Sequence, residues 1–176
     1  MTSKGSKKAA AKPLVGVVMG SDSDLPVMQR CLDTLDSLGI GWEVRVISAH
    51  RTPDIAHEYS TTAAGRGLKV IIAAAGMSAA LGGVMAAGTT LPVIGVPMAS
   101  GPLAGFDAAL STMQMPPGVP VACMAIDKAG ATNAAVFAAQ IIALSDRKLA
   151  AKLAAFKKDQ ADKVIEKDRA LRGKQR

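Results

Sequence analysis

The sequence predicts an α/β protein: a three-layer αβα fold with a flavodoxin-like parallel five-stranded sheet in the order 2-1-3-4-5 and an extra C-terminal helix. Five short apolar runs alternate with segments whose apolar residues recur at helical spacing, which is typical of buried parallel strands joined by helices. Right-handed crossovers then leave few strand orders, of which 2-1-3-4-5 is common. The length of 176 residues fits one domain.

The strands and helices are expected to alternate along the chain. Strands are predicted at residues 14–20, 42–48, 69–76, 91–97 and 119–126. Helices are predicted at residues 25–38, 52–67, 78–88, 102–113 and 131–145. Gly39 is placed to end the first helix, and Pro53 is placed in the first turn of the second.

The net charge of +7 lies at the two ends of the chain. Residues 1–12 hold four lysines and no acid, and residues 146–176 hold eleven basic and five acidic residues. Residues 13–145 hold six basic and nine acidic residues, so the body is mildly acidic. With only 3% aromatic residues, the chain also lacks the rings on which bases stack. We therefore expect no nucleic-acid partner; a basic-tailed nucleic-acid protein is the competing hypothesis.

These charges and patterns predict three parts. Residues 13–145 form the flavodoxin-like domain, residues 1–12 form a disordered basic tail, and residues 146–176 form a long charged helix. This helix does not fit the layers of one compact domain, and it carries only a sparse stripe of apolar residues among many charges. We therefore expect it to pack on a neighbouring subunit. The apolar faces at residues 78–88 and 133–144 exceed what one domain needs, so we predict a homo-oligomer.

The expected location is the cytoplasm. Cys31 and Cys123 lie far apart on apolar segments, as buried reduced thiols do. No run approaches the roughly 18 apolar residues of a membrane span, and the basic N-terminus lacks the apolar region of a secretory signal. We expect no membrane partner. Metal-ligand spacings such as HxxxH and CxxC do not occur, so no metal is expected.

The loop after the first strand, "MGSDSD", is a candidate anion site. Ser21 and Ser23 offer hydroxyl donors beside the amides at a helix start, where anions bind. Asp22 or Asp24 would repel a phosphate unless it is directed elsewhere, for instance at ribose hydroxyls. The competing interpretation is simple helix capping by Ser and Asp.

The loop after the second strand, "SAHRTPD", carries the clearest chemistry. The imidazole of His50 can move a proton near neutral pH, and Arg51 can hold a phosphate or carboxylate. Ser48 or Thr52 can cap the following helix. The alternative is a structural histidine beside a surface arginine. The other histidine, His57, falls within the helix and is expected on the surface or in packing.

Three further loops are weaker candidates. The Ala- and Gly-rich "AAAGMSAALGG" lets backbone approach a ligand closely, although tight helix packing explains it equally well. The loop "MASGPLAGFD" is Gly-rich and expected to be mobile. In "DKAGATNAA", Lys128 and Asn133 are candidates to reach a ligand, and solvated side chains are the alternative.

Taken together, "GSDSD", "SAHRTPD" and "QMPPGVPVA…KAGATNAAVFAAQI" resemble the class I family of N5-carboxyaminoimidazole ribonucleotide mutases of purine biosynthesis. The resemblance runs from about Val15 to Leu144. It implies an isomerase that moves a carboxylate from the exocyclic nitrogen to ring carbon C4 of an imidazole nucleotide. It further implies a homo-octamer with active sites between subunits and no metal, ATP or organic cofactor.

The same resemblance assigns the site residues. His50 falls on the catalytic histidine of the family, where it would act as the proton shuttle. The substrate-binding residues implied by the matching motifs are Ser21, Ser23, Asp24, Ser48, Ala49, Arg51, Ala75, Gly76, Ser78, Ala79 and Leu81.

Two departures keep other functions open. Most class I members have a histidine where this chain has Ala80 and a proline where it has Gly82. The Met-Ser-Ala-Ala form is closer to the class II branch, which carboxylates aminoimidazole ribonucleotide directly with CO2, and to the pyridinium biscarboxylate nucleotide synthases. Arg51, in place of Lys, disfavours class II, and the first and last loops disfavour the synthases. A non-catalytic nucleotide- or flavin-binding module is the alternative from another class.

Overall fold

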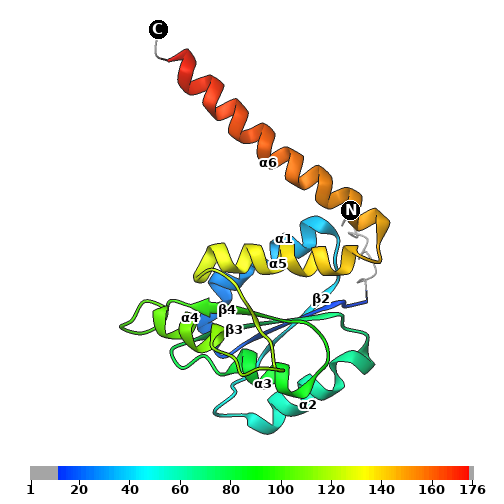
Figure 1. The fold of residues 1–176 in the computed structure, drawn as a ribbon, viewed down its shortest axis with the longest axis vertical. Coiled ribbons are helices and arrows are strands. Elements are labelled where there is room, and N and C mark those ends of the chain that lie inside the picture. Colours follow the sequence, from blue (N-terminus) through cyan, green and yellow to red (C-terminus); the bar gives the residue numbers. More distant parts are fainter. Residues whose placement is uncertain (1–11, 175–176) are drawn as a thin grey trace, which may run out of the picture.

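The protein forms one parallel sheet with helices on both faces (Figure 1). The computed structural model describes residues 12–174, so all but Lys12 of the predicted basic tail lies outside the described residues. The strands are β1 (Val15–Met19), β2 (Trp42–Val46), β3 (Val70–Gly76), β4 (Val93–Met98) and β5 (Ala122–Cys123). Their order, β2-β1-β3-β4-β5, confirms the predicted flavodoxin-like topology.

Helices form the two outer layers. They are α1 (Leu25–Leu38), α2 (Pro53–Arg66), α3 (Leu81–Gly88), α4 (Phe106–Met113), α5 (Asp127–Ala143) and α6 (Arg147–Gly173), and a 3-10 turn, η1 (Asp22–Asp24), precedes α1. One hydrophobic core joins the sheet to α1 and α5, and a second joins the opposite face to α2 and α3. The central strands are therefore buried on both sides, which explains their continuous apolar runs.

Local signals set several boundaries as predicted. Gly39 ends α1 with a left-handed φ of 74°, a conformation that glycine adopts at little cost. Pro53 is the first residue of α2. The carboxylate of Asp146 accepts the backbone N–H groups of Lys148 (2.9 Å) and Leu149 (3.0 Å), and so caps α6.

Other predicted boundaries were wrong. The last strand was expected over residues 119–126, but only Ala122 and Cys123 pair with β4. Pro120 cannot donate to a strand ladder, and Met124 makes only one further bond, from its N–H to the Gly95 carbonyl (2.9 Å). Strand β5 is thus a short edge strand.

The third and fourth helices begin later than predicted, while α5 begins earlier. Met77 takes a φ of 56° ahead of α3, and Ala104 takes 50° ahead of α4. A left-handed residue interrupts a right-handed helix, so Ala104 keeps the first residues of the predicted fourth helix out of α4. Met77 stands just before the predicted third helix, whose residues 78–80 are non-helical before α3 begins at Leu81. Both loops border the pocket described below.

Helix α6 projects away from the domain (Figure 1). Its first turns are anchored: Leu149 is buried, and Lys152 Nζ donates to the Leu38 carbonyl (2.9 Å) at the end of α1. Farther out, three i,i+4 ion pairs line the helix: Lys158–Asp162, Lys163–Asp159 and Arg172–Asp168. None of the helices within residues 12–174 combines the length and apolar character that a membrane crossing requires.

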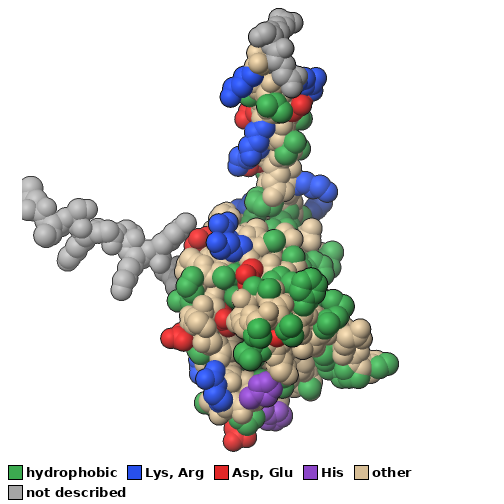
Figure 2. All heavy atoms as spheres, turned by 90° about the vertical axis from the view of Figure 1, so that its left-hand side faces the viewer, with side chains coloured by type: hydrophobic (Ala, Val, Ile, Leu, Met, Phe, Trp, Pro, Cys, Tyr) green, Lys and Arg blue, Asp and Glu red, His purple; other side chains and the backbone are tan. Residues whose placement is uncertain are grey.

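The exposed apolar surface lies only partly where the sequence predicts it. The alanines of α5 are buried against α1 and the sheet, while Phe137 (36% exposed) and Leu144 (89% exposed) of the same segment are open. Four further large apolar residues are exposed on and just before α4, with Phe106 reaching 71% exposure: Leu103, Phe106, Leu110 and Met113. Figure 2, seen from the α4 side, shows hydrophobic side chains gathered on this face.

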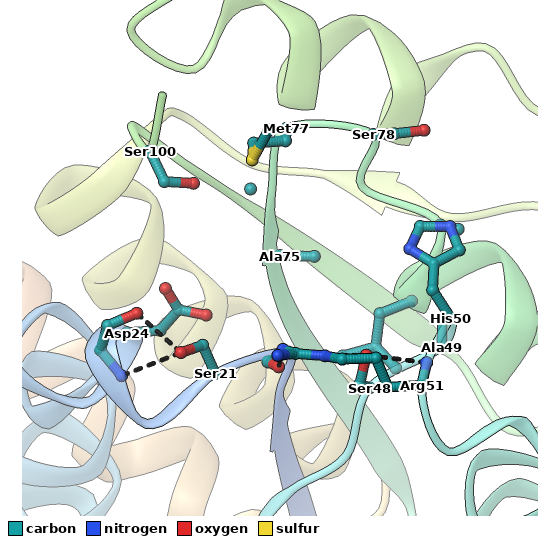
Figure 3. Close-up of a pocket in the computed structure, with 15 residues that line it drawn as sticks. Ser21, Asp24, Ser48, Ala49, His50, Arg51, Ala75, Met77, Ser78 and Ser100 are labelled. Atoms are coloured by element: carbon teal, nitrogen blue, oxygen red, sulfur yellow. Dashed lines mark hydrogen bonds between the residues drawn. The ribbon is translucent and has the colours of Figure 1, made fainter. Parts of the chain in front are cut away.

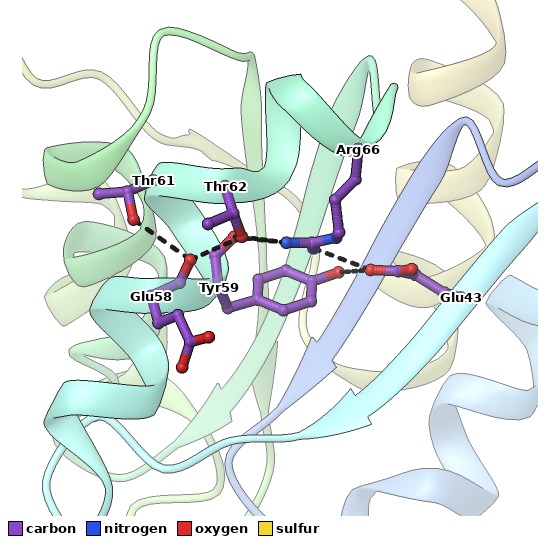
Figure 4. Close-up of polar contacts among 6 residues, drawn as sticks. All are labelled: Glu43, Glu58, Tyr59, Thr61, Thr62 and Arg66. Carbon is purple, nitrogen blue, oxygen red and sulfur yellow. Dashed lines mark hydrogen bonds and ion pairs between the residues drawn. The ribbon is translucent and has the colours of Figure 1, made fainter.

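A polar cluster of Glu43, Tyr59 and Arg66 fastens α2 to the edge strand β2 (Figure 4). The buried Tyr59 hydroxyl donates to Glu43 Oε1 (2.8 Å), and Arg66 Nη2 lies 3.0 Å from the same oxygen. The Arg66 guanidinium also stacks over the Tyr59 ring, 4.5 Å from its centroid. Burial, with the nearby Glu43 carboxylate, raises the pKa of Tyr59. The cluster holds the helix that directly follows the "SAHR" loop.

We expect Tyr59→Phe to lower the free energy of unfolding by about 1–2 kcal/mol, because a hydrogen bond to a charged acceptor is lost while the ring stays packed. Urea unfolding monitored by circular dichroism measures this. The matched control is Arg172→Ala, which removes an exposed ion pair on α6 and should cost well under about 1 kcal/mol. Equal losses in the two variants would contradict a role for this cluster.

Candidate functional site

A pocket of about 590 Å³ opens at the carboxyl ends of β1, β2, β3 and β4, which is where open α/β sheets bind ligands. Its volume suits a small molecule. It is lined by Gly20, Ser21, Ser23, Asp24, Ser48, Ala49, His50, Arg51, Ala75, Gly76, Met77, Ser78, Ala80, Leu81 and Ser100. Figure 3 shows how side chains from four separate loops enclose it.

The first loop supplies hydroxyl groups. Ser21 caps η1 by accepting the Ser23 backbone N–H (3.3 Å), and the Ser23 hydroxyl donates to Ser21 Oγ (2.8 Å). The capping interpretation therefore holds for Ser21, which lines the pocket as well. Asp24 occupies the N-cap position of α1 but makes no capping hydrogen bond with its side chain. Its carboxylate is therefore available to a ligand in the pocket.

The carboxyl of Asp24 is buried yet faces the pocket. The residue is only 7% exposed. Burial raises its pKa, and the negative charges of Asp127 and Asp22 raise it further, while a hydrogen bond with the Ser21 backbone opposes them. A carboxyl of this kind can accept hydrogen bonds from sugar hydroxyls.

The second loop presents His50 and Arg51. A turn closed by Thr52 shapes it: the Ser48 N–H donates to Thr52 Oγ1 (3.0 Å), and that hydroxyl donates to the Ser48 carbonyl (2.9 Å). Thr52 sits at the N-cap position of α2, but its hydroxyl is used in this turn. His50 is exposed at one wall of the pocket (Figure 3).

Arg51 joins the first two loops. Its Nε donates to Ser48 Oγ (3.3 Å), and its Nη2 donates to the Gly20 carbonyl (3.2 Å). An arginine side chain has five N–H donors, so these two bonds orient the guanidinium and leave donors for an anion.

The third and fourth loops form the rest of the wall. Ala75 and Gly76 end β3, and Ser100 lies over Gly76, where an added Cβ would be 1.6 Å from the Ser100 hydroxyl. Met77 is exposed at the rim. The small residues let the two backbones approach each other and leave the space empty for a ligand.

The pocket brings together His50 and ten of the eleven substrate-binding residues that the sequence assigned. The exception is Ala79, which is 3% exposed and is not among the lining residues. Lys128 and Asn133 also lie outside the lining. His57 is exposed on α2, as expected.

Sequence reasoning did not assign four residues of the lining: Gly20, Met77, Ala80 and Ser100. Ser100 lies in the Gly-rich fourth loop, "MASGPLAGFD", in which the sequence singles out no residue as a ligand contact. No sequence pattern points to Met77, because its place at the pocket rim depends on its left-handed backbone conformation. Within residues 12–174, no three His, Cys, Asp or Glu side chains are grouped to hold a metal ion.

Gly76→Ala is expected to displace Ser100 and to lower the free energy of unfolding by about 1–3 kcal/mol, because the new methyl overlaps the hydroxyl. Chemical denaturation measures the loss. Gly20→Ala is the matched control in the same pocket, since its Cβ would meet nothing closer than the Ala74 carbonyl at 3.9 Å, and it should stay within about 0.5 kcal/mol of the parent. Similar losses in both would show that Ser100 yields freely.

The chain is similar to proteins of known name along most of its length. It is 53% identical over 155 residues to the N5-carboxyaminoimidazole ribonucleotide mutase of Bacillus subtilis, covering 88% of this chain and 96% of the relative. It is 50% identical over 160 residues to the mutase of the same name from Pyrococcus horikoshii, covering 91% and 89%.

Solved structures and a family model agree with these relatives. The crystal structure of Treponema denticola PurE superimposes with a TM-score of 0.78 at 32% identity, covering 90% of this chain and 98% of that one. The family model described as AIR carboxylase matches residues 14–163. With its parallel sheet and its pocket at the strand ends, this chain belongs to the AIR carboxylase family.

Proposed function

We propose that this chain is an N5-carboxyaminoimidazole ribonucleotide mutase, an isomerase of purine biosynthesis. The observation that carries the proposal is the convergence of the first three loops on one pocket, with His50 in its wall and Arg51 across its base. Relatives that carry this name are about half identical over nearly their whole length. The cytoplasmic location stays a prediction.

The pocket offers complementary groups for each part of the nucleotide. The hydroxyls of Ser21 and Ser23 and the guanidinium of Arg51 suit the phosphate and the transferred carboxylate. Asp24 suits the ribose hydroxyls, which donate hydrogen bonds to a carboxylate. The imidazole base would then lie toward His50.

His50 would carry both proton transfers. As imidazolium it gives a proton to the carbamate nitrogen, the C–N bond breaks, and its electron pair stays on that nitrogen as CO2 leaves. Ring carbon C4 then attacks CO2, the new C–C bond forms, and neutral His50 removes the C4 proton. One imidazole can do both because it gives and accepts protons near neutral pH. The proton balance closes, since His50 ends as imidazolium.

Keeping CO2 beside the base requires a small, dry space. Ala75, Gly76, Ala80 and Leu81 supply small or apolar walls. His50 and Arg51 are exposed in the single subunit, so a second subunit would be needed to cover them. The exposed apolar residues of α4 support such an assembly, and a homo-octamer is the form that we propose from the resemblance. Residues 146–176 would pack on a neighbour in it.

The substrate test separates the mutase from a direct carboxylase on the same fold. Purified protein receives either fresh N5-carboxyaminoimidazole ribonucleotide at low bicarbonate or aminoimidazole ribonucleotide with added bicarbonate. We expect the 4-carboxy product, followed by ultraviolet absorbance, from the first mixture. Product from the bicarbonate mixture alone would reject the mutase and favour the carboxylase.

We expect His50→Asn to reduce kcat by at least about 10²-fold, because asparagine cannot shuttle a proton. Nucleotide binding, measured by calorimetry, should remain detectable. Arg51→Ala is the contrasting variant: it should mainly raise KM by removing the anion clamp. A non-catalytic binding module would instead tolerate His50→Asn without loss of function.

A further inference from the structure

Residues 98–105, which begin at the last residue of β4, form part of the pocket wall. This segment carries Ser100, which lines the pocket and packs on Gly76. It contains left-handed residues, including Gly101 and Ala104, and its internal hydrogen bonds are local turns. Its position on the domain therefore depends on contacts with other segments.

Both ends of this loop are held by the start of α5. Asp127 Oδ1 accepts the backbone N–H of Ala99 (2.8 Å), the residue before Ser100. At the other end, Gly105 packs so closely on Ile126 that an added Cβ would lie 2.8 Å from Ile126 Cγ2. Ile126 and Asp127 are adjacent in the chain, so both ends of the loop contact the same place at the start of α5.

Asp127 makes this hydrogen bond from an energetically unfavourable backbone conformation. Its φ is 57°, in the left-handed region where a side chain costs energy and aspartate is among the few residues found. Residues persist there when their surroundings demand it, and they cluster at functional sites. The bond to Ala99 is the contact that this conformation makes.

The charge of Asp127 also reaches the ligand pocket. After burial, the carboxylate of Asp127 is the larger of the two charges that raise the pKa of Asp24, and Asp22 on η1 is the other. Across the pocket stand His50 and Arg51. Lys128, beside Asp127 on α5, is exposed. Asp24 faces the ligand, so the charge of Asp127 acts on the pocket indirectly.

We propose that Asp127 is a positioning residue of this enzyme, which holds the Ser100 loop against the pocket through its bond to the Ala99 N–H. It touches no reacting atom and does not line the pocket. The inference rests on the proposed mutase function, because the pocket that this loop borders is taken to bind the nucleotide. The loop contact itself does not depend on that function.

Two variants of the full chain separate the tether from the charge. Asp127→Asn keeps an acceptor oxygen and a side chain that tolerates the left-handed backbone, but it removes the charge. Asp127→Gly relieves the backbone and removes both acceptor and charge. Circular dichroism checks that each variant is folded.

Hydrogen–deuterium exchange without nucleotide tests the tether. In Asp127→Gly, the amides of residues 98–105 should exchange about tenfold faster, because the hydrogen bond that holds the Ala99 N–H is lost. In Asp127→Asn, exchange should stay near that of the parent. Unchanged exchange in Asp127→Gly overturns the proposal. This arm remains decisive even if the protein fails to convert the carboxyamino nucleotide, a result that would reject the proposed function alone.

Steady-state kinetics test whether the tether serves the pocket. Asp127→Gly should raise KM more than it lowers kcat, because the wall that carries Ser100 is released while no reacting group changes. Asp127→Asn, which keeps an acceptor oxygen, should have a KM near that of the parent. An Asp127→Gly variant with the KM of the parent, or an Asp127→Asn variant as impaired as Asp127→Gly, overturns the positioning role.

Discussion

The alignment of three parallel strands is the constraint on which the site depends. Met19 at the end of β1 stands opposite both Val46 and Ala74, so the loops after β1, β2 and β3 emerge at one edge. The ladder continues past the strands, with the Ile47 N–H on the Met19 carbonyl (2.8 Å) and the Gly20 N–H on the Ala74 carbonyl (3.1 Å). A slip in this register would separate the hydroxyls of the first loop from the imidazole of the second.

Arg51 shows how structure and binding share one side chain. Its bonds to the Gly20 carbonyl and Ser48 Oγ tie two loops together before any ligand arrives. The guanidinium is thereby oriented in advance, which lowers the entropy that an anion must offset on binding. Opposite it, Asp24 stays buried beside other carboxylates. The pocket therefore carries a guanidinium and a carboxyl group on different loops.

The two halves of the pocket are held differently. The half made by the first two loops is bound internally, through the Ser48–Thr52 turn and Arg51. The half that carries Ser100 depends on the start of α5, a segment distant in sequence. A site that must admit a nucleotide and then retain CO2 benefits from one rigid wall and one wall whose position is set by contacts at the start of α5.

The sequence by itself determined the elements, the layers and the polar loops, because strand and helix periodicity and the helix-boundary residues Gly39, Pro53 and Asp146 are local signals. The strand order followed from the handedness of the crossovers. The sequence also predicted that His50 and Arg51 line the pocket, since a polar pair at a strand end is visible in the chain. Only the tertiary structure decided that Ser100 joins the pocket and that Ala79 does not. These depend on contacts between segments far apart in the chain and on left-handed backbone, neither of which leaves a local pattern.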